Sequence, residues 1–453
     1  METTSVSGAY VSGPTAAKAE NPAKMAAKRV MGNANFRLLW AGQATSLVGD
    51  QFYMIALPWL VLLMTGDAAA LGLVLALTGV PRAVFMLVGG AVSDRFSQRS
   101  IMLVSDVLRL GLTAGLAAMV FTGNVEMWML YALAIAFGVV SGFFMPASQS
   151  IVPRIVGKED LMIGNSIVQS SSLLSVLVGP LLAGGLITCF AGGQATIAGS
   201  SPIMTGVGLA FALDALTFLV SVVTLGMMKV EAPRAPPEGK GILTSIAEGI
   251  AYAAKSRRLV ALLGLAAVIN FLFAGPVVVG IPVIASTRLP EGAAAFGVLM
   301  AASAVGSLAG MIASGVVKVP PRYLGLAIAV AVGFFGIGLA AIGFIGSMWI
   351  GVAILLVLGA VNGYTGIVLL TLLQKSTPPE MMGRLMSLVT ISSVGLVPIS
   401  QALSGFALKV SIEGLFVGCG ALIVLLAVLA ASSENIRGIG VETLGQPRVQ
   451  TNS

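Results

Sequence analysis

The sequence contains no histidine, only two cysteines, and few charged side chains, which make up 9% of its residues. Without histidine, no His-based proton relay, triad or metal site can form. Cys189 and Cys419 stand far apart in apolar surroundings, so we expect buried thiols and no disulfide. The Gly-rich loop that marks ATP hydrolysis is also missing. We therefore expect no enzyme activity, no metal and no cofactor.

Apolar residues dominate what is present. They account for 57% of the chain, and the mean hydropathy is +1.00. Soluble domains carry about 25% charged residues, so this composition indicates a polytopic membrane protein. Runs long enough to cross a bilayer occur at residues 37–64, 69–92, 100–122, 127–150, 161–190, 205–229, 258–286, 292–316, 322–345, 348–373, 384–408 and 412–432. The predicted fold class is an all-α membrane protein with twelve transmembrane helices.

The basic residues predict how the chain is oriented in the membrane. Of 25 Lys and Arg residues, 21 fall in the two tails and the even-numbered connections, all on one face. The other four are Arg82, Arg109, Arg288 and Lys409. Positive residues gather on the cytosolic side of membrane proteins, so both termini are predicted to be cytosolic. The net charge of +7 then fits a topology signal, and we expect no nucleic-acid partner.

A proline-rich, charged segment at 231–240 divides the twelve runs six and six. An amphipathic stretch at 242–254 follows it and is expected on the cytosolic surface. Two six-helix halves in the same topology form a parallel repeat related by pseudo-symmetry. We predict a disordered cytosolic tail, an N-terminal bundle, a cytosolic linker, a C-terminal bundle and a second cytosolic tail at residues 1–35, 36–230, 231–257, 258–432 and 433–453.

Three ionisable residues, Asp50, Arg82 and Asp214, are predicted at membrane depth, where an uncompensated charge is costly. Asp50 lies near the middle of the first run, and Arg82 lies at similar depth in the second, just after Pro81. A buried carboxylate and guanidinium at one depth can pair, and protonation of the carboxylate would open the pair. We assign all three residues to proton coupling. The structural alternatives are a hydrogen-bonded carboxylate, a static ion pair and a protonated, inert Asp214.

Polar residues also share single helix faces. Those between Gln43 and Tyr53, with Asp50 among them, recur at spacings of three and four and form one stripe on the first helix. Such a stripe suits a helix that lines an aqueous cavity. The fifth run carries a similar polar face that includes Ser172. The residues that these faces predict for a substrate cavity are Gln43, Ser46, Tyr53, Asn165 and Gln169.

Asp106 and Arg109 are three residues apart near the start of the third run and can pair on one helix face. We place this pair in a cytosolic gate and not at the substrate site. Within the seventh to tenth runs no acidic residue lies at depth. Proton handling is therefore expected in the N-terminal half.

Two motifs carry a family resemblance. The turn Gly90–Arg99 resembles the signature between the second and third helices of major facilitator transporters, a glycine followed by Asp94-Arg95 and a further arginine. In the fifth run, Gly179-Pro180 followed by Gly184-Gly185 is similar to the antiporter motif of proton-driven exporters. Over residues 35–432 the chain resembles the drug:proton antiporter branch, which includes macrolide and siderophore exporters.

The resemblance implies further site residues. In the family, the acid that matches Asp94 contacts the cytosolic end of the eleventh helix, here near Arg384, and holds the cytosolic gate shut. The antiporter motif comprises Gly179, Pro180 and Gly184, and Asn270 joins the substrate cavity. With the third-helix pair, the predicted gate comprises Gly90, Asp94, Arg95, Arg99, Asp106, Arg109 and Arg384. The turn Gly90–Arg99 has fewer basic residues than is typical of the family, and the matching loop in the second half of the chain has no acidic residue. These departures predict an asymmetric gate.

The combined expectation is a secondary active transporter, a proton-coupled exporter of a hydrophobic or amphipathic small molecule such as a drug, a macrolide-like compound or a siderophore. Alternating access would rock the two halves about a central cavity. The expected partners are a small-molecule substrate, protons and the lipid bilayer, and the expected state is a monomer in a bacterial-type cytoplasmic membrane. The alternatives are an uptake carrier or lysophospholipid flippase, and a non-transporting receptor or assembly factor.

Overall fold

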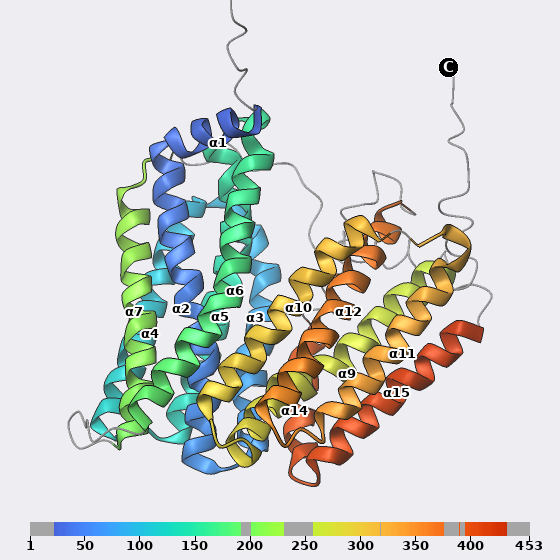
Figure 1. Ribbon diagram of the computed structural model, residues 1–453. Helices are drawn as coiled ribbons and strands as arrows, with labels where there is room; N and C mark the ends of the chain where they lie inside the picture. Colours follow the sequence, from blue (N-terminus) through green and yellow to red (C-terminus); the bar gives the residue numbers. More distant parts are fainter. Residues whose placement is uncertain are drawn as a thin grey trace, which may run out of the picture.

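The computed structural model describes residues 22–191, 201–230, 257–317, 319–375, 389 and 395–432. Within these residues every regular element is an α-helix or a short 3₁₀ turn (Figure 1). Helices suit apolar runs in lipid because they pair all their backbone polar groups internally. Helix ends carry the usual caps: the Asp67 side chain accepts a hydrogen bond from Ala69 N–H, and Gly66 and Gly123 take left-handed conformations.

The first half of the chain forms one bundle, which we call the N-terminal bundle. Within it, α2 packs on α6 and α7, α3 packs on α5, and α4 packs on α5 and α7. Its elements are α1 (Pro22–Gly32), α2 (Ala34–Thr65), α3 (Ala68–Arg95), α4 (Gln98–Thr122), α5 (Met127–Ile155), η1 (Lys158–Asp160), α6 (Leu161–Ala191) and α7 (Pro202–Met227).

The second half forms the C-terminal bundle. Here α10 packs on α12, α11 packs on α15, and α9 packs on α14. Its elements are α9 (Arg257–Arg288), α10 (Ala293–Val316), η2 (Pro321–Tyr323), α11 (Leu324–Ile342), α12 (Met348–Lys375), α14 (Val397–Leu408) and α15 (Ile412–Ser432).

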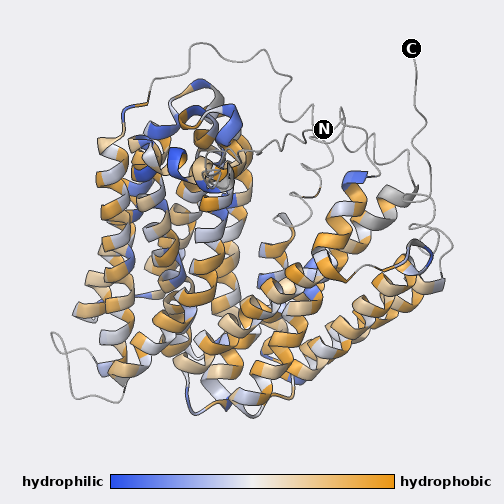
Figure 2. Cartoon of the chain, turned by 45° about the horizontal axis from the view of Figure 1, so that its top comes forward, coloured by the Kyte–Doolittle hydropathy of each residue, from blue (hydrophilic) through white to orange (hydrophobic). Residues whose placement is uncertain are grey.

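The prediction of an all-α membrane fold is confirmed. Eleven of the described helices are long and apolar enough to cross a membrane, and α14 is a shorter apolar helix within the predicted run 384–408. Apolar residues cover most of the helical surface, whereas hydrophilic residues gather where helices end (Figure 2). Most predicted helix ends fall within a few residues of the observed ones, because caps and turns interrupt the apolar runs.

The two bundles meet near one end of the molecule and separate toward the other (Figure 1). We call the end on which α1 lies the terminal side, and the opposite end the far side. Between the bundles, α3 packs against α14 and α6 packs against α10. These two contacts form a seam on the far side.

Small residues allow the close approach at this seam. A Cβ atom placed on Gly184 would lie 2.5 Å from the carbonyl oxygen of Ala293 in α10. A Cβ atom on Gly72 would lie 2.6 Å from the carbonyl oxygen of Gln401 and 3.0 Å from Cα of Gly405 in α14. Glycine at these positions therefore brings helix backbones of opposite bundles together.

An ion pair also crosses the seam. Lys409 Nζ lies 2.7 Å from a carboxylate oxygen of Asp67, which caps α3. The lysine holds the pKa of the Asp67 carboxyl below its usual range, chiefly through their hydrogen bond. A different pair, Arg288 with Glu413, stays within the C-terminal bundle.

Two sequence expectations need correction. Part of the tail expected to be disordered forms helix α1, because the Arg29 guanidinium pairs with Asp160 at 2.6 Å and Val30 is buried against the bundle. Cys189 is exposed and not buried, which suits an apolar thiol on a membrane helix. Both cysteines are free thiols, as expected. Apart from Arg257, the predicted linker and the C-terminal tail lie outside the described residues.

Candidate transport cavity

A cavity of about 1260 Å³ lies between the bundles. On the terminal side its wall includes Gln149 near the end of α5 and Asn165 near the start of α6. It continues past the middle of α2 to Leu57 and Pro180, next to the seam. Because the seam closes the far side, the cavity opens toward the terminal side.

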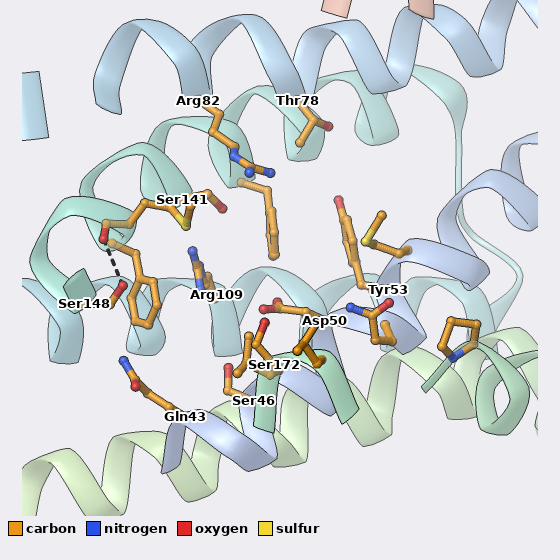
Figure 3. Close-up of a pocket in the computed structure, with 18 of the residues that line it drawn as sticks. Gln43, Ser46, Asp50, Tyr53, Thr78, Arg82, Arg109, Ser141, Ser148 and Ser172 are labelled. Carbon is orange, nitrogen blue, oxygen red and sulfur yellow. Dashed lines mark hydrogen bonds between the residues drawn. The ribbon is translucent and has the colours of Figure 1, made fainter. Parts of the chain in front are cut away.

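The polar stripe predicted on α2 lines this cavity. Gln43, Ser46, Asp50 and Tyr53 all belong to its wall, and all four are labelled in Figure 3. The buried Gln43 Oε1 has no hydrogen-bond partner among the described residues. The Tyr53 ring stacks on Phe137, with 4.4 Å between centroids. The spacing of three and four residues therefore puts one face of α2 on the cavity wall, and its contact with a substrate stays a prediction.

Asp50 occupies the middle of α2, where its half-buried carboxylate points into the cavity (Figure 3). The guanidiniums of Arg82 and Arg109 line the same cavity. Neither guanidinium lies within ion-pairing distance of the carboxylate, and Asp50 forms no ion pair with any described residue. The carboxylate is therefore open to water, a proton or a ligand in the cavity.

Arg82 projects from the middle of α3, on the opposite side of the cavity from Asp50 (Figure 3). Its Nε is buried and has no hydrogen-bond partner among the described residues. The depth predicted for Arg82 agrees with its position, but the direct Asp50–Arg82 pair that we considered is not formed in this conformation. The space of the cavity separates the two groups.

Arg109 and Asp106 lie deeper than the sequence analysis placed them. Arg109 is in the middle of α4 and lines the cavity, so its part in a gate stays a prediction. Its guanidinium carbon sits 4.3 Å from the centre of the Phe144 ring, and its Nη1 lies 3.8 Å from Asp106. The Ser221 hydroxyl donates a 2.6 Å hydrogen bond to the same carboxylate. At 1.5 Å rise per residue, the third turn of a helix already lies about 15 Å inside.

Asp214 is fully buried in α7 and does not line the cavity. Neither carboxylate oxygen has a hydrogen-bond partner among the described residues. A Cβ atom placed on Gly49 would lie 2.6 Å from Asp214 Oδ1. The glycine therefore lets a second carboxylate approach α2 right beside Asp50.

The remaining predicted cavity residues divide into two groups. Asn165, Gln169 and Ser172 of α6 line the cavity, as their shared helix face predicted. Asn270 of α9 is half-buried and lies outside the cavity wall. The C-terminal bundle instead contributes Gln401 of α14, which the sequence analysis did not single out.

The predicted gate residues of the second and third helices stay within the N-terminal bundle. Helix α3 continues through the half-buried Gly90 and includes Asp94 before it ends at the exposed Arg95. The Arg99 guanidinium donates hydrogen bonds of 2.7 Å to the carbonyls of Leu225 and Gly226, which ties the turn to the end of α7. Arg384 lies outside the described residues, so its contact with Asp94 stays a prediction.

The glycine-proline motif of α6 lies at the seam. A Cβ atom on Gly179 would collide with the Gln51 side chain, and one on Gly297 of α10 would collide with the Pro180 carbonyl. Gly184 meets the backbone of α10 one turn further along. The motif therefore brings α6 close to α2 within its own bundle and to α10 across the seam.

Comparison with known proteins gives these features a family context. The sequence profile of the family described as Major Facilitator Superfamily matches residues 39–400. Macrolide efflux protein A from Streptococcus pyogenes is 24% identical, over 90% of this chain and 98% of the relative. Enterobactin exporter EntS from Salmonella typhi is 27% identical, over 90% of each chain.

Solved structures share the fold. The nucleoside transporter NupG matches with a TM-score of 0.70 at 11% identity, covering 87% of this chain and 98% of its own. A bacterial homologue of the iron transporter ferroportin, in an inward-facing state, matches with a TM-score of 0.65 at 18% identity, covering 88% and 99%.

Proposed function

Because this chain belongs to the Major Facilitator Superfamily, we propose that it is a secondary transporter that exports a hydrophobic or amphipathic small molecule in exchange for protons. Similarity to a macrolide efflux protein and an enterobactin exporter supports export. The cavity suits an amphipathic molecule, because charged side chains on the wall from the N-terminal bundle face hydrocarbon on the other wall. A drug, a macrolide-like compound or a siderophore has this character.

The terminal side would face the cytosol. The excess of Lys and Arg in the tails and in the connections on that side supports this orientation. The described conformation is then open to the cytosol and closed at the outer surface, ready to receive cargo from inside. One chain carries both bundles and the whole cavity, so we propose a monomer in a bacterial-type cytoplasmic membrane.

The observation that carries the coupling proposal is the unpaired Asp50 carboxylate on the cavity wall, which shares the cavity with the guanidiniums of Arg82 and Arg109 but forms an ion pair with neither. Exchange requires that proton and substrate exclude each other. A proton on a carboxylate oxygen of Asp50 removes the anion that a donor group of the substrate would contact. A substrate seated against the carboxylate would in turn block its protonation.

Asp214 would hold a second proton near the first. It stands on the other side of α2 from the cavity, beside Gly49, and its oxygens lack partners among the described residues. Two carboxylates this close interact, so the ionisation of one disfavours the ionisation of the other. Release of a proton from Asp50 would therefore depend on the state of Asp214.

The test is transport by the purified protein in proteoliposomes with an imposed proton gradient. The cargo panel contains a macrolide, enterobactin, Hoechst 33342 and ethidium. We expect Asp50→Asn to lower gradient-driven flux at least tenfold while the protein stays folded and still equilibrates cargo down its own gradient. Glu126→Gln is the matched control, because this exposed carboxylate near the far side contacts only the neighbouring Trp128.

Full gradient-driven flux by Asp50→Asn would remove this residue from the mechanism. Accumulation of cargo against the expected direction would favour an uptake carrier. Movement of lysophospholipid between leaflets, without transport of the panel, would favour a flippase.

A further inference from the structure

The wall contributed by the C-terminal bundle is apolar at all but one of its described positions. Its lining residues are Val278, Phe296, Met300, Val397, Pro398 and Gln401. Among the described residues, every charged side chain on the cavity wall comes from the other bundle. The amide of Gln401 is therefore the polar group that the described part of the C-terminal bundle presents to a ligand.

The Gln401 side chain is almost fully enclosed, with 9% of the residue exposed, yet its amide makes no hydrogen bond to any described residue. A primary amide carries two donor hydrogens and an accepting oxygen. Buried polar groups in proteins nearly always have partners, so one that faces a cavity without a partner points to a ligand or to ordered water.

The backbone holds this amide in a defined place. The hydroxyl of the preceding residue, Ser400, accepts a 2.9 Å hydrogen bond from Gly275 N–H and donates one to the Phe271 carbonyl. These two hydrogen bonds to backbone groups of α9 hold α14 against α9. On the opposite side, the Gln401 carbonyl abuts Gly72 of α3. A rigidly held amide discriminates between ligands better than a mobile one.

We propose that Gln401 is the specificity-determining contact of the C-terminal bundle, and that its NH₂ group donates a hydrogen bond to a carbonyl or ether oxygen of the substrate. This proposal rests on the proposed transport function. It narrows the substrate to an amphipathic molecule with a donor group at the Asp50 end, hydrocarbon in between and an acceptor oxygen at the Gln401 end. A cargo of this kind contacts both bundles at once.

The experiment uses the full-length protein in lipid nanodiscs, without any proton gradient, and Nile red as the probe. Nile red is neutral and has no donor, but its carbonyl accepts hydrogen bonds, and its emission then moves to longer wavelength. Gln401→Met keeps the side-chain size and removes the amide. Gln401→Glu keeps an acceptor but offers no donor when ionised, and Gln401→Asn keeps a shorter amide. Gln374→Met is the matched control, on the exposed surface near the end of α12.

We expect saturable binding to the wild type, and Kd values about three- to tenfold higher for Gln401→Met and Gln401→Glu, with emission moved to shorter wavelength. Gln401→Asn should recover part of both signals, and Gln374→Met should match the wild type. The emission shift separates a hydrogen bond from a mere packing effect. Thermal unfolding of each variant verifies the fold, and if Gln401→Met does not fold, Gln401→Asn and Gln401→Glu decide the question.

Absence of saturable Nile red binding to the wild type would overturn the proposal, and so would unchanged affinity and emission in Gln401→Met. Asp50 and the proton gradient take no part in this measurement. If the Gln401 variants bind Nile red more weakly with shifted emission, but Asp50→Asn keeps full gradient-driven flux, the coupling proposal is refuted and the Gln401 contact is supported. If the Gln401 variants bind Nile red like the wild type, but Asp50→Asn loses gradient-driven flux, the Gln401 contact alone is refuted.

Discussion

The two bundles have the same number of predicted spans, but their charged residues lie at different positions along the helices. The N-terminal bundle keeps Asp50, Arg82, Asp106, Arg109 and Asp214 inside its helices, at or near their middles. In the described helices of the C-terminal bundle, every charged residue lies within two positions of a helix end.

This difference indicates a division of labour. An ionisable group at membrane depth is expensive and is retained where it has a function. The bundle that carries such groups can respond to protons, whereas the other presents a hydrocarbon wall with a single amide. Alternating access then requires protonatable groups in one bundle only, provided that contacts at the seam make both bundles move when such a group gains or loses a proton.

The largest effect is expected where the bundles touch. Gly184→Leu places a branched side chain against the α10 backbone, since even a Cβ atom would lie 2.5 Å from the Ala293 carbonyl. We expect transport to fall more than tenfold because the far side can no longer close. Gly185→Leu, one residue further on the same helix, meets nothing within 4 Å and should transport normally. Equal loss in both variants would mean that the seam is not the sensitive contact.

The next effect concerns stability and tests the difference in charge placement directly. Arg109→Gln leaves the Asp106 carboxylate buried without its cation, and we expect a loss of roughly 3 kcal/mol in unfolding free energy. Arg288→Gln, which breaks the more exposed Arg288–Glu413 pair of the C-terminal bundle, should lose much less. Denaturant titration monitored by dichroism measures both. Adding Asp106→Asn to Arg109→Gln should recover part of the loss.

A smaller effect is expected from the ion pair across the seam. Asp67→Asn should raise maleimide labelling of Leu62→Cys, a buried position in the pocket beside this pair, about two- to fivefold in a background without native cysteines. The partly exposed pair is worth little in energy, so the shift is modest. The exchange Asp67→Lys with Lys409→Asp should restore low labelling, whereas Glu413→Gln, which breaks a pair within one bundle, should change nothing.

The smallest effect is a pH dependence of the same labelling. The pKa of Asp67 is lowered by Lys409 in the closed seam, so the pair stabilises closure above the ordinary carboxyl pKa near ~4 and this stabilisation disappears as the outer pH falls through the lowered value. The labelling rate of Leu62→Cys, divided by that of free cysteine at the same pH so that the loss of thiolate cancels, should therefore rise below about pH 4 with Asp67 present. In the Asp67→Asn background this ratio should be flat over that range, and a matching rise there would assign the titration to another group.

The features that periodicity encodes could be predicted from the sequence. Apolar runs gave the helices, and the spacing from Gln43 to Tyr53 gave the face that lines the cavity, because helix geometry turns spacing into direction. The depth of Arg82 followed from its place in its run. Helix α1 was missed because its Ala- and Lys-containing sequence is weakly apolar, and its order depends on a contact between Arg29 and the distant Asp160.

The contacts made between helices could not be predicted in this way. Arg109 points into the cavity because α4 packs on α5 and α7, and nothing in its own run determines that rotation. Gln401 is one of three buried polar residues of α14, and only its place on the cavity wall distinguishes it from Ser400 and Ser404. The approach of Asp214 to α2 depends on Gly49, and that pairing of a carboxylate with a glycine has no signature in a single sequence.

The anchoring of α1 has a practical consequence for watching this protein at work. Arg29 and Val30 hold the helix to the N-terminal bundle, and the end of α15 belongs to the C-terminal bundle, so a dye on each would travel with a different rigid body. Lys24 and Ser432 are exposed and suit such labels. Energy transfer between them would rise each time the terminal side closes, giving a single-molecule record of the transport cycle.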